Sequence, residues 1–385
     1  MQGTWNRTDI KELGRRLQRA NGELWLQQVK GDPYADLLRG HAEDPRPAQE
    51  RIRALGPLWR SATGAWVTAD HALAAELLGG TWPHRPLTDE EAHVPVHGAG
   101  LGGDAARYEH LRGHVRDAVT PAAVDAVCER VVGGLAADFD LVTDLAEVVA
   151  VDLLAATLGP AGADRRELAR SCAAAGVVLD GLLCPQPLDA TRRAVAAVGR
   201  LRELLAAPAT GPGPGPGPQE AAVLLATAGV RTAARLTAGA VLAVVDHPAQ
   251  WSRLADDPAH AAPVVAEVLR HDPPVQIHPA VALADTEFAG QRVAAGGRVV
   301  VLVAAANRDP EVFDAPDRFV TGRPAEALAP ALYHRVTWPF ARAQAEAVLR
   351  ALAAAGPRPR RSAGHLRSRR SPVTRHLLGC PLTTG

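Results

Sequence analysis

Glu267-Val-Leu-Arg270 opens the stretch of sequence that decides the fold of this 385-residue chain. Two further segments follow it, Ala306-Asn-Arg-Asp-Pro310 and Phe313-Asp-Ala-Pro-Asp-Arg-Phe319. The first segment lies on a predicted helix, where opposite charges three residues apart are common, so it is weak evidence by itself. The three segments together, in this order and at this spacing, are strong evidence for a single type of fold.

Helical patterns dominate the sequence on both sides of these segments. Residues 9–29 have the periodicity of an amphipathic helix, and residues 219–245 are so apolar that we expect a helix buried through the centre of the molecule. Residues 57–68 are typical of a β-hairpin that turns at Thr63-Gly64, and Asp70 is a predicted helix cap. Residues 275–303 alternate like short strands, and a last helix is predicted over 340–355. We therefore predict a mainly α protein with small β-sheets.

From about residue 57 to residue 355 the chain resembles the cytochrome P-450 family, on the strength of the three segments. The resemblance implies the P-450 fold as a single domain over residues 1–385. It also implies that Glu267, Arg270 and Arg318 form a buried ion-pair triad with a structural role. Within the domain we expect an N-terminal helical extension (1–50), a loop of Gly-Pro pairs (208–219) and an Arg-rich C-terminal segment (357–385).

The haem-ligand loop of that family has no counterpart here. The resemblance implies a Gly-rich loop with a cysteine that ligates iron just before the last helix. The interval in this chain reads Leu328-Ala-Pro-Ala-Leu-Tyr-His-Arg-Val-Thr-Trp338, with neither cysteine nor glycine. Counting back from Ala341-Arg342 places Arg335 at the ligand position, and a cation cannot replace the thiolate that such an iron needs.

Other positions that serve haem in the family are also changed. Ala280 stands where an arginine would bind one propionate, and Tyr108 and Arg112 stand where a histidine and an arginine would bind the other. The oxygen-activating motif appears as Ala228-Gly-Val-Arg-Thr232, in which Thr232 remains but Arg231 replaces the proton-relaying acid and stays protonated. We therefore expect no haem or other cofactor, no catalytic residue and no enzymatic activity.

A more specific resemblance is to the P-450-like auxiliary proteins of antibiotic glycosyltransferases, which lack the haem cysteine. It rests on Gly31-Asp-Pro-Tyr-Ala-Asp-Leu-Leu-Arg-Gly-His41, Glu43-Asp-Pro45, Trp66-Val-Thr-Ala-Asp-His71, Pro185-Gln-Pro187 and Arg369-Arg-Ser-Pro-Val-Thr374. The resemblance implies a partner, a TDP-deoxysugar glycosyltransferase of macrolide or related polyketide antibiotic biosynthesis. This chain would bind and activate that enzyme in a hetero-oligomer.

Two regions are candidates for partner binding. Leu13 and Leu17 of the N-terminal helix are either core residues or an interface, because hydrophobic periodicity does not separate the two. The segment from Pro357 onward has seven arginines and no acid, so it is either a solvated face or a docking patch for an acidic partner, with Arg367, Arg369 and Arg370 as candidates.

Composition excludes several other classes. The net charge is zero, which argues against nucleic acid as the main partner, and no run of 18 apolar residues predicts a membrane span. The N-terminus has no apolar signal-peptide core, so we expect a soluble cytoplasmic protein. The four cysteines form no Cys-x-x-Cys pair, and Pro95 separates His93 from His97, so no metal site is expected. The glycines of residues 98–103 follow no predicted strand, which disfavours a dinucleotide site.

Two alternatives remain open from the sequence. His334, next to Arg335, could ligate haem in an atypical enzyme, because imidazole also binds haem iron. The chain could instead bind a small molecule in the vacated haem pocket.

Overall fold

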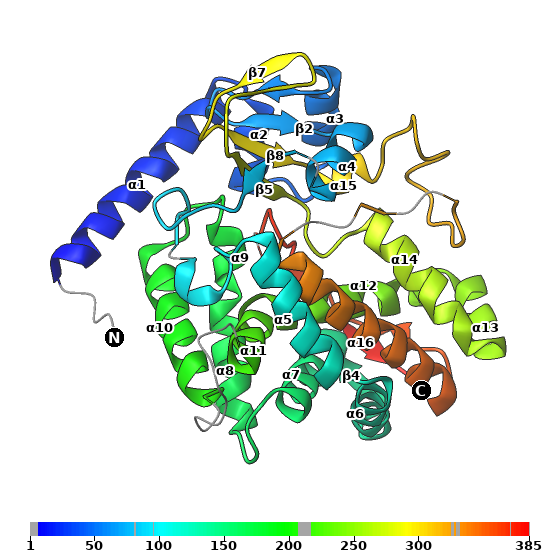
Figure 1. Ribbon diagram of the computed structural model, residues 1–385. Coiled ribbons are helices and arrows are strands. Elements are labelled where there is room, and N and C mark those ends of the chain that lie inside the picture. Colours follow the sequence, from blue (N-terminus) through cyan, green and yellow to red (C-terminus); the bar gives the residue numbers. More distant parts are fainter. Residues whose placement is uncertain are drawn as a thin grey trace.

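The computed structural model describes residues 7–80, 82–94, 96–206, 217–324, 327–328, 332–369 and 371–384. Helices make up most of this part of the chain, and most of the larger sheet lies at the end of the molecule that is uppermost in Figure 1. The predicted mainly α class with small sheets is confirmed.

The α-helices are α1 Arg7–Val29, α2 Pro33–Arg39, α3 Arg46–Ala54, α4 His71–Gly79, α5 Ala105–Ala118, α6 Pro121–Gly133, α7 Glu147–Thr157, α8 Arg165–Ala175, α9 Val177–Gly181, α10 Leu188–Leu204, α11 Pro218–Leu224, α12 Val230–Asp246, α13 Pro248–Asp256, α14 Ala261–His271, α15 Val303–Ala306 and α16 His334–Ala355. Short 3₁₀ turns are η1 His97–Ala99 and η4 Pro258–His260, and π-helical turns are η2 Leu141–Ala146 and η3 Leu225–Gly229. The strands are β1 Trp59–Arg60, β2 Trp66–Thr68, β3 His84–Arg85, β4 Asp138–Asp140, β5 His278–Ala282, β6 Thr286–Phe288, β7 Gln291–Val293, β8 Arg298–Val301, β9 Arg360–Arg361, β10 Arg367–Ser368, β11 Leu377–Gly379 and β12 Pro381–Thr383.

Capping residues fix where several helices begin. The side chain of Asp70 accepts a hydrogen bond from the Leu73 amide and caps α4, as predicted. Thr120 caps α6, and Pro121 occupies the first helical position, where its missing N–H removes no intrahelical bond. The sequence signals at these sites and the observed helix starts therefore agree.

The larger sheet joins distant parts of the chain in the order β1-β2-β8-β5-β3. The predicted hairpin is present as antiparallel β1 and β2, turning at Gly64, whose φ is +88°. β2 pairs with β8 in parallel, and β5 is antiparallel to β8 and β3. Near the C-terminus, β12 joins β4 to β9, and β10 pairs with β11.

One continuous helical segment, Pro218–Asp246, forms the centre of the molecule. It consists of α11, the π turn η3 and α12. Its 29 residues are long and apolar enough to cross a membrane, but 94% of the apolar window is buried inside the protein. The segment is therefore a core helix, as predicted, and α16 packs along α12.

Two predicted boundaries were wrong. We predicted the last helix from Phe340, but α16 begins at His334 and carries Pro339 inside it. A proline this early in a helix removes a single backbone hydrogen bond, so the helix can continue. Most of the predicted Gly-Pro loop 208–219 lies outside the described residues, and its last two residues already belong to α11, because proline favours the first helical position.

Candidate functional site

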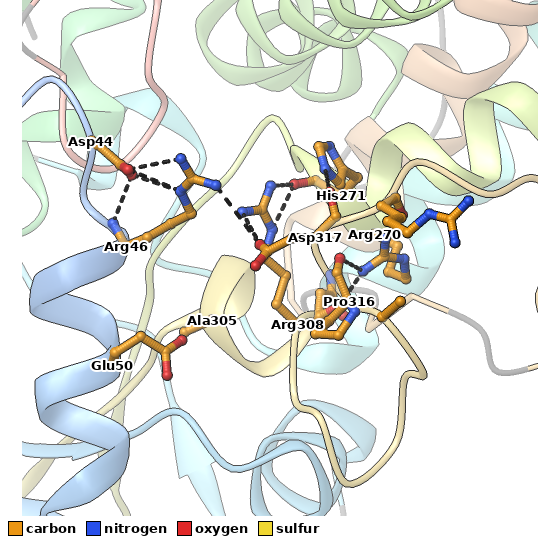
Figure 2. A network of polar contacts seen from close by, with 12 residues as sticks. Asp44, Arg46, Glu50, Arg270, His271, Ala305, Arg308, Pro316 and Asp317 are labelled. Atoms are coloured by element: carbon orange, nitrogen blue, oxygen red, sulfur yellow. Dashed lines mark hydrogen bonds and ion pairs between the residues drawn. The ribbon is translucent and has the colours of Figure 1, made fainter. Parts of the chain in front are cut away.

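The three segments that decide the fold meet around a buried ion pair. Arg270 donates from Nε and Nη2 to Oε2 and Oε1 of Glu267 over 2.8 and 2.7 Å, and the two residues are 1% and 4% exposed. Arg270 Nη1 also donates to the carbonyl of Asn307 over 3.0 Å and to that of Pro316 over 2.9 Å, the latter visible in Figure 2. The ion pair thus binds α14 to both of the segments that follow it.

The second arginine of this cluster is Arg323, not Arg318 as predicted. Arg323 Nε lies 3.3 Å from Glu267 Oε1. Arg318 has an exposed side chain, and its backbone carbonyl accepts a hydrogen bond from Arg270 Nη2 over 3.2 Å. The chain turns at Gly322, where φ is +78°, and this turn brings Arg323 to the carboxylate.

A second network braces the same segments against the N-terminal helices (Figure 2). Arg308 donates from Nε and Nη2 to the His271 carbonyl at the end of α14 over 3.2 and 2.6 Å, and from Nη1 to Asp317 over 3.2 Å. Asp317 also lies 3.8 Å from Arg46 of α3, which pairs with Asp44 over 2.8 Å. Arg308 of the second segment and Asp317 of the third are therefore bound within the fold rather than presented to a ligand.

A row of four buried rings crosses the region that the resemblance ties to haem. Tyr108 on α5, Tyr333 and His334 at the start of α16, and His278 on β5 are at most 3% exposed. Successive ring centroids lie 6.5, 3.9 and 5.5 Å apart. Contacts this close leave no room for a porphyrin between these side chains.

Tyr108 braces a neighbouring loop instead of a propionate. Its hydroxyl donates to the carbonyl of Gly100 over 3.0 Å and accepts from the amide of Gly103 over 2.9 Å. Burial raises the pKa of Tyr108 to about 12, so it remains a neutral phenol. The glycine-rich residues 98–103 begin within the 3₁₀ turn η1 and do not directly follow a strand, unlike the glycines of a dinucleotide-binding loop.

The two histidines in the row are held neutral. Burial lowers the pKa of His278 to about 3 and that of His334 well below its usual value. Both ring nitrogens of each histidine lack a hydrogen-bond partner among the described residues. An unpaired buried polar group costs roughly 1–3 kcal/mol, so the row is less stable than an apolar core of the same shape.

The remaining predicted haem positions lie apart from one another. Arg335 is exposed and lines a surface cavity of about 740 Å³. Arg112 is exposed on α5 and pairs with Glu109 over 3.2 Å. Ala280 is buried in β5 and has no side-chain donor. On α12, Thr232 Oγ1 donates to the Ala228 carbonyl over 2.7 Å, the local bond expected of a lone threonine in a helix.

Arg231, which stands at the position of the proton-relaying acid, points toward α8. It is 7% exposed, and Nη2 donates to the Ala173 carbonyl over 3.2 Å. Arg231 therefore belongs to a different part of the interior from the row of rings.

The cysteines do not provide a thiolate. All four are free and buried, and burial raises the pKa of Cys128 and Cys172 to about 12 and that of Cys184 well above its usual value. Burial also raises the pKa of Cys380. Rings pack together in the region that the resemblance ties to haem, the arginine at the predicted ligand position is exposed, and burial keeps the thiols protonated. The residues present do not fit a haem.

A buried carboxylate fixes the start of the C-terminal segment. Asp180 on α9 is 4% exposed, and its Oδ2 accepts from Ser371 Oγ over 2.7 Å and from Thr374 Oγ1 over 3.2 Å. Its Oδ1 accepts from the Val373 amide over 3.1 Å, and the Val373 carbonyl accepts from the Gln276 amide over 2.7 Å. This arrangement, called the Asp180 latch below, holds residues 371–374 against the core.

The strands on either side of the latch in the sequence, β9 in the sheet of β4 and β12 and the pair β10 and β11, carry several arginines and are called here the basic ribbon. Arg360 and Arg367 are exposed, and neither forms an ion pair with a carboxylate of the described residues. Leu366 and Leu378 are 48% and 43% exposed on the same strands and turns. Arg369 is half-buried, and Arg370 lies outside the described residues. The ribbon therefore presents positive charge beside apolar side chains.

Two of the segments that carry the more specific resemblance, residues 31–45 and 369–374, meet beside the ribbon. A cleft of about 550 Å³ lies between residues 40–45, α12 and residues 361–377. Arg375 Nη2 donates to the Glu43 carbonyl over 3.1 Å, and a Cβ added at Gly40 would lie 2.7 Å from Pro372. Opposite ends of the sequence thus build one surface.

Leu13 and Leu17 are core residues, so of the two alternatives left open by the sequence, core or partner groove, the partner groove is wrong. They are 4% and 2% exposed, and their helix α1 packs on α2 and α10. The leucine stripe faces the protein's own core, while Trp25, Leu26 and Val29 of the same helix are 53%, 42% and 65% exposed.

A metal centre has no obvious place in the described part of the chain. There, no group of three or more His, Cys, Asp or Glu side chains could hold an ion. His93 makes a backbone hydrogen bond to Gly181 over 2.9 Å, and burial lowers its pKa to about 4.

Comparison with known proteins identifies clear relatives. The family model described as cytochrome P-450 matches residues 259–341. Protein DesVIII of Streptomyces venezuelae is 40% identical over 97% of this chain and 94% of its own length. Cytochrome P-450 family protein EryCII of Saccharopolyspora erythraea is 36% identical over 97% of this chain and 99% of its own length. The crystal structure of ligand-free CYP164A2 from Mycobacterium smegmatis has a TM-score of 0.76 and 25% identity, over 91% of this chain and 99% of that chain.

Proposed function

This chain belongs to the cytochrome P-450 family, and from that premise we propose that it is a non-catalytic auxiliary protein that binds and activates a deoxysugar glycosyltransferase. The partner would act in macrolide or related polyketide antibiotic biosynthesis. The proposal combines full-length homology to DesVIII and EryCII with the sequence resemblance to P-450-like auxiliary proteins.

The row of buried rings is the observation that carries the non-catalytic part of the proposal. The four rings pack against one another in the order Tyr108, Tyr333, His334 and His278. His334 is therefore a packed core residue and not a free axial ligand. None of these four residues lines the cavities described here. This arrangement supports neither an atypical haem enzyme nor a ligand in a vacated haem pocket.

The basic ribbon is the surface that we assign to partner binding. Exposed arginines without carboxylate partners favour an acidic partner surface, and the adjoining leucines add apolar contact area. Because the Asp180 latch holds residues 371–374 in place, the ribbon would lose little conformational freedom on binding. Two of the predicted docking residues lie in the described part of the chain. Arg367 is exposed, and Arg369 is half-buried.

Activation requires no chemistry from this chain. Binding to the competent state of the transferase, and not to its unfolded or inactive states, shifts the population toward that competent state. The expected effect is therefore on both the stability and the turnover of the partner.

The test is sugar transfer by a deoxysugar glycosyltransferase from the same gene cluster, produced with and without this chain. We expect the transferase to be active, and to have a higher Tm, when the two proteins are produced together. Equal activity and equal Tm in both preparations would rule out the auxiliary role.

The ribbon is tested separately by the double variant Arg360→Glu and Arg367→Glu. We expect about a tenfold or larger loss of affinity for the transferase, because attraction becomes repulsion. Arg116→Glu is the matched control, since this side chain is 77% exposed on α5, away from the ribbon. An equal loss in the control, or no loss in the double variant, would place the interface elsewhere.

A further inference from the structure

A second candidate site lies between α8 and α12, and His376, the residue before β11 of the basic ribbon, forms part of its wall. A pocket of about 270 Å³, open to the surface on one side, is lined by residues of η2, α7, α8 and α12 and by His376, and the buried Arg231 forms part of its wall. Most of the lining is apolar, including Val148, Val151, Ala169, Cys172, Val230 and Ala234. The cavity is smaller than the roughly 300–1,000 Å³ of pockets that hold drug-sized ligands, so its occupant must be small.

Arg231 is an incompletely paired cation in this wall. It is 7% exposed, and its Nη2 bond to the Ala173 carbonyl lies near the C-terminal end of α8, where the helix dipole is negative. Nη1 has no hydrogen-bond partner among the described residues, and none of their carboxylates lies within ion-pair distance of Arg231. A buried charge without a counter-ion is costly, and pairing with an anion would relieve that cost.

Arg235, one turn further along α12, shows how this helix satisfies a buried arginine. Its Nη2 pairs with Asp272, and its Nε donates to the Arg375 carbonyl over 3.0 Å. Arg231 and Arg235 are 7% and 6% exposed, so they are equally buried, but only Arg235 has a direct carboxylate partner. Arg231 therefore lacks the direct ion pair that its neighbour has, and the carboxylates of Asp180 and Glu147 attract it only from beyond ion-pair distance.

The two carboxylates that line the cavity, those of Asp152 and Glu147, do not form an ion pair with Arg231. Asp152 is already paired with Arg130 and Arg165 over 2.7 and 2.8 Å. Glu147 lies 3.8 Å from His376; burial raises its pKa, and the charge of Arg231 partly opposes that shift. Arg165 and Arg166 also line the cavity and add positive charge.

We propose that this cavity binds a small monocarboxylate with an apolar body, whose carboxylate pairs with the Arg231 guanidinium while its hydrocarbon packs on the valine and alanine lining. The pairing would form a charge-assisted hydrogen bond in a largely desolvated site. This site is independent of the proposed auxiliary function, and it stands or falls on direct binding to the purified chain.

The test is calorimetric titration of the full-length chain with octanoate, and with octan-1-ol as the uncharged analogue. We expect saturable octanoate binding to the parent protein and about a tenfold or larger loss of affinity in Arg231→Met. The affinity for octan-1-ol should change little, because it does not need the cation. Undetectable octanoate binding to the parent, or equal octanoate affinity in Arg231→Met, would overturn the proposal.

Gly176→Ala provides a second variant that keeps the charge. A Cβ at Gly176 would lie 2.3 Å from Arg231 Nε, so the substitution must displace the guanidinium. We expect weaker octanoate binding in Gly176→Ala and unchanged binding in Arg360→Met, which removes an exposed arginine of the ribbon. If Arg231→Met abolished transferase activation while octanoate failed to bind the parent, the cavity would belong to the partner interface and the carboxylate proposal would be wrong.

Discussion

The carboxylate of Glu267 is the most highly connected acceptor of the segments that decide the fold. It pairs with Arg270 and Arg323, and its Oε1 also accepts from the Val320 amide over 2.9 Å. Removing the carboxylate would leave the Arg270 guanidinium buried and unpaired.

We therefore expect Glu267→Ala to lower the free energy of unfolding by about 3–5 kcal/mol. Arg323→Ala should also destabilise the protein, because Arg323 pairs with the same carboxylate and donates to three backbone carbonyls. Urea unfolding followed by circular dichroism measures both changes.

Arg318→Ala is the matched control for these variants. Its side chain is exposed, and its carbonyl bond to Arg270 survives the substitution, so the change should stay within about 0.5 kcal/mol. A large loss in Arg318→Ala and none in Arg323→Ala would reverse the assignment of the second arginine.

The sequence predicted one of the ion-pair partners of Glu267 correctly and gave the other one wrongly. Glu267 and Arg270 could be paired from the sequence, because a helix fixes the geometry of residues three apart. The choice between Arg318 and Arg323 depends on the turn at Gly322, and a turn in an irregular segment has no periodicity to reveal it. Asp180 gave no signal, since its partners lie more than 190 residues away in the sequence.

At the scale of elements, helices were predicted well where a cap or a strong period marks them. Asp70 gave a correct start, and the apolar run of α12 gave a buried helix. The apolar face of α1 could not be assigned to the core or to a partner from the sequence. Periodicity shows that an apolar stripe exists but does not show which surface packs against it. The structure assigns Leu13 and Leu17 to the core.

The Asp180 latch leads to a prediction about one element. Asp180→Ala removes the acceptor for Ser371, Val373 and Thr374, and these groups then lie unpaired in the interior. We expect faster amide hydrogen exchange in residues 371–384 and earlier tryptic cleavage within the basic ribbon. Exchange and cleavage in the rest of the chain should change less.

Asp189→Ala is a suitable control for the latch, because this acid is 73% exposed on α10 and pairs with the exposed Arg193. It should leave exchange in residues 371–384 unchanged. Equal exchange in Asp180→Ala and the parent protein would show that packing alone holds the segment.

For the whole molecule, buried neutral histidines make stability depend on pH. Burial lowers the pKa of His278 and His376 to about 3, that of His93 to about 4, and that of His334 well below 6.5. The unfolded chain binds these protons first as the pH falls, so the stability they contribute is present above about pH 6.5 and is lost below it.

We expect the free energy of unfolding to fall between about pH 6.5 and pH 4, with each such histidine adding about 1.4 kcal/mol per pH unit to the slope. Urea unfolding at a series of pH values measures this slope. His334→Phe should make it shallower, and His278→Phe provides an independent second variant. An unchanged slope in both variants would show that the histidines in the row of rings do not take part.

The changes that we predict at haem positions are spread over several elements, so we expect that a single substitution would not create a haem site. Arg335→Cys places a thiol at the predicted ligand position, but that position is exposed at the 740 Å³ surface cavity. The rings of Tyr333 and His334 still fill the interior, and Ala280 still offers no cation to a propionate. We expect Arg335→Cys, produced with a haem precursor, to remain colourless, with the circular dichroism spectrum and Tm of the parent chain. Absorption spectra before and after reduction under carbon monoxide decide the matter. A haem band in this variant would mean that the chain lacks only a thiolate ligand and that the four ring side chains rearrange easily to admit a porphyrin.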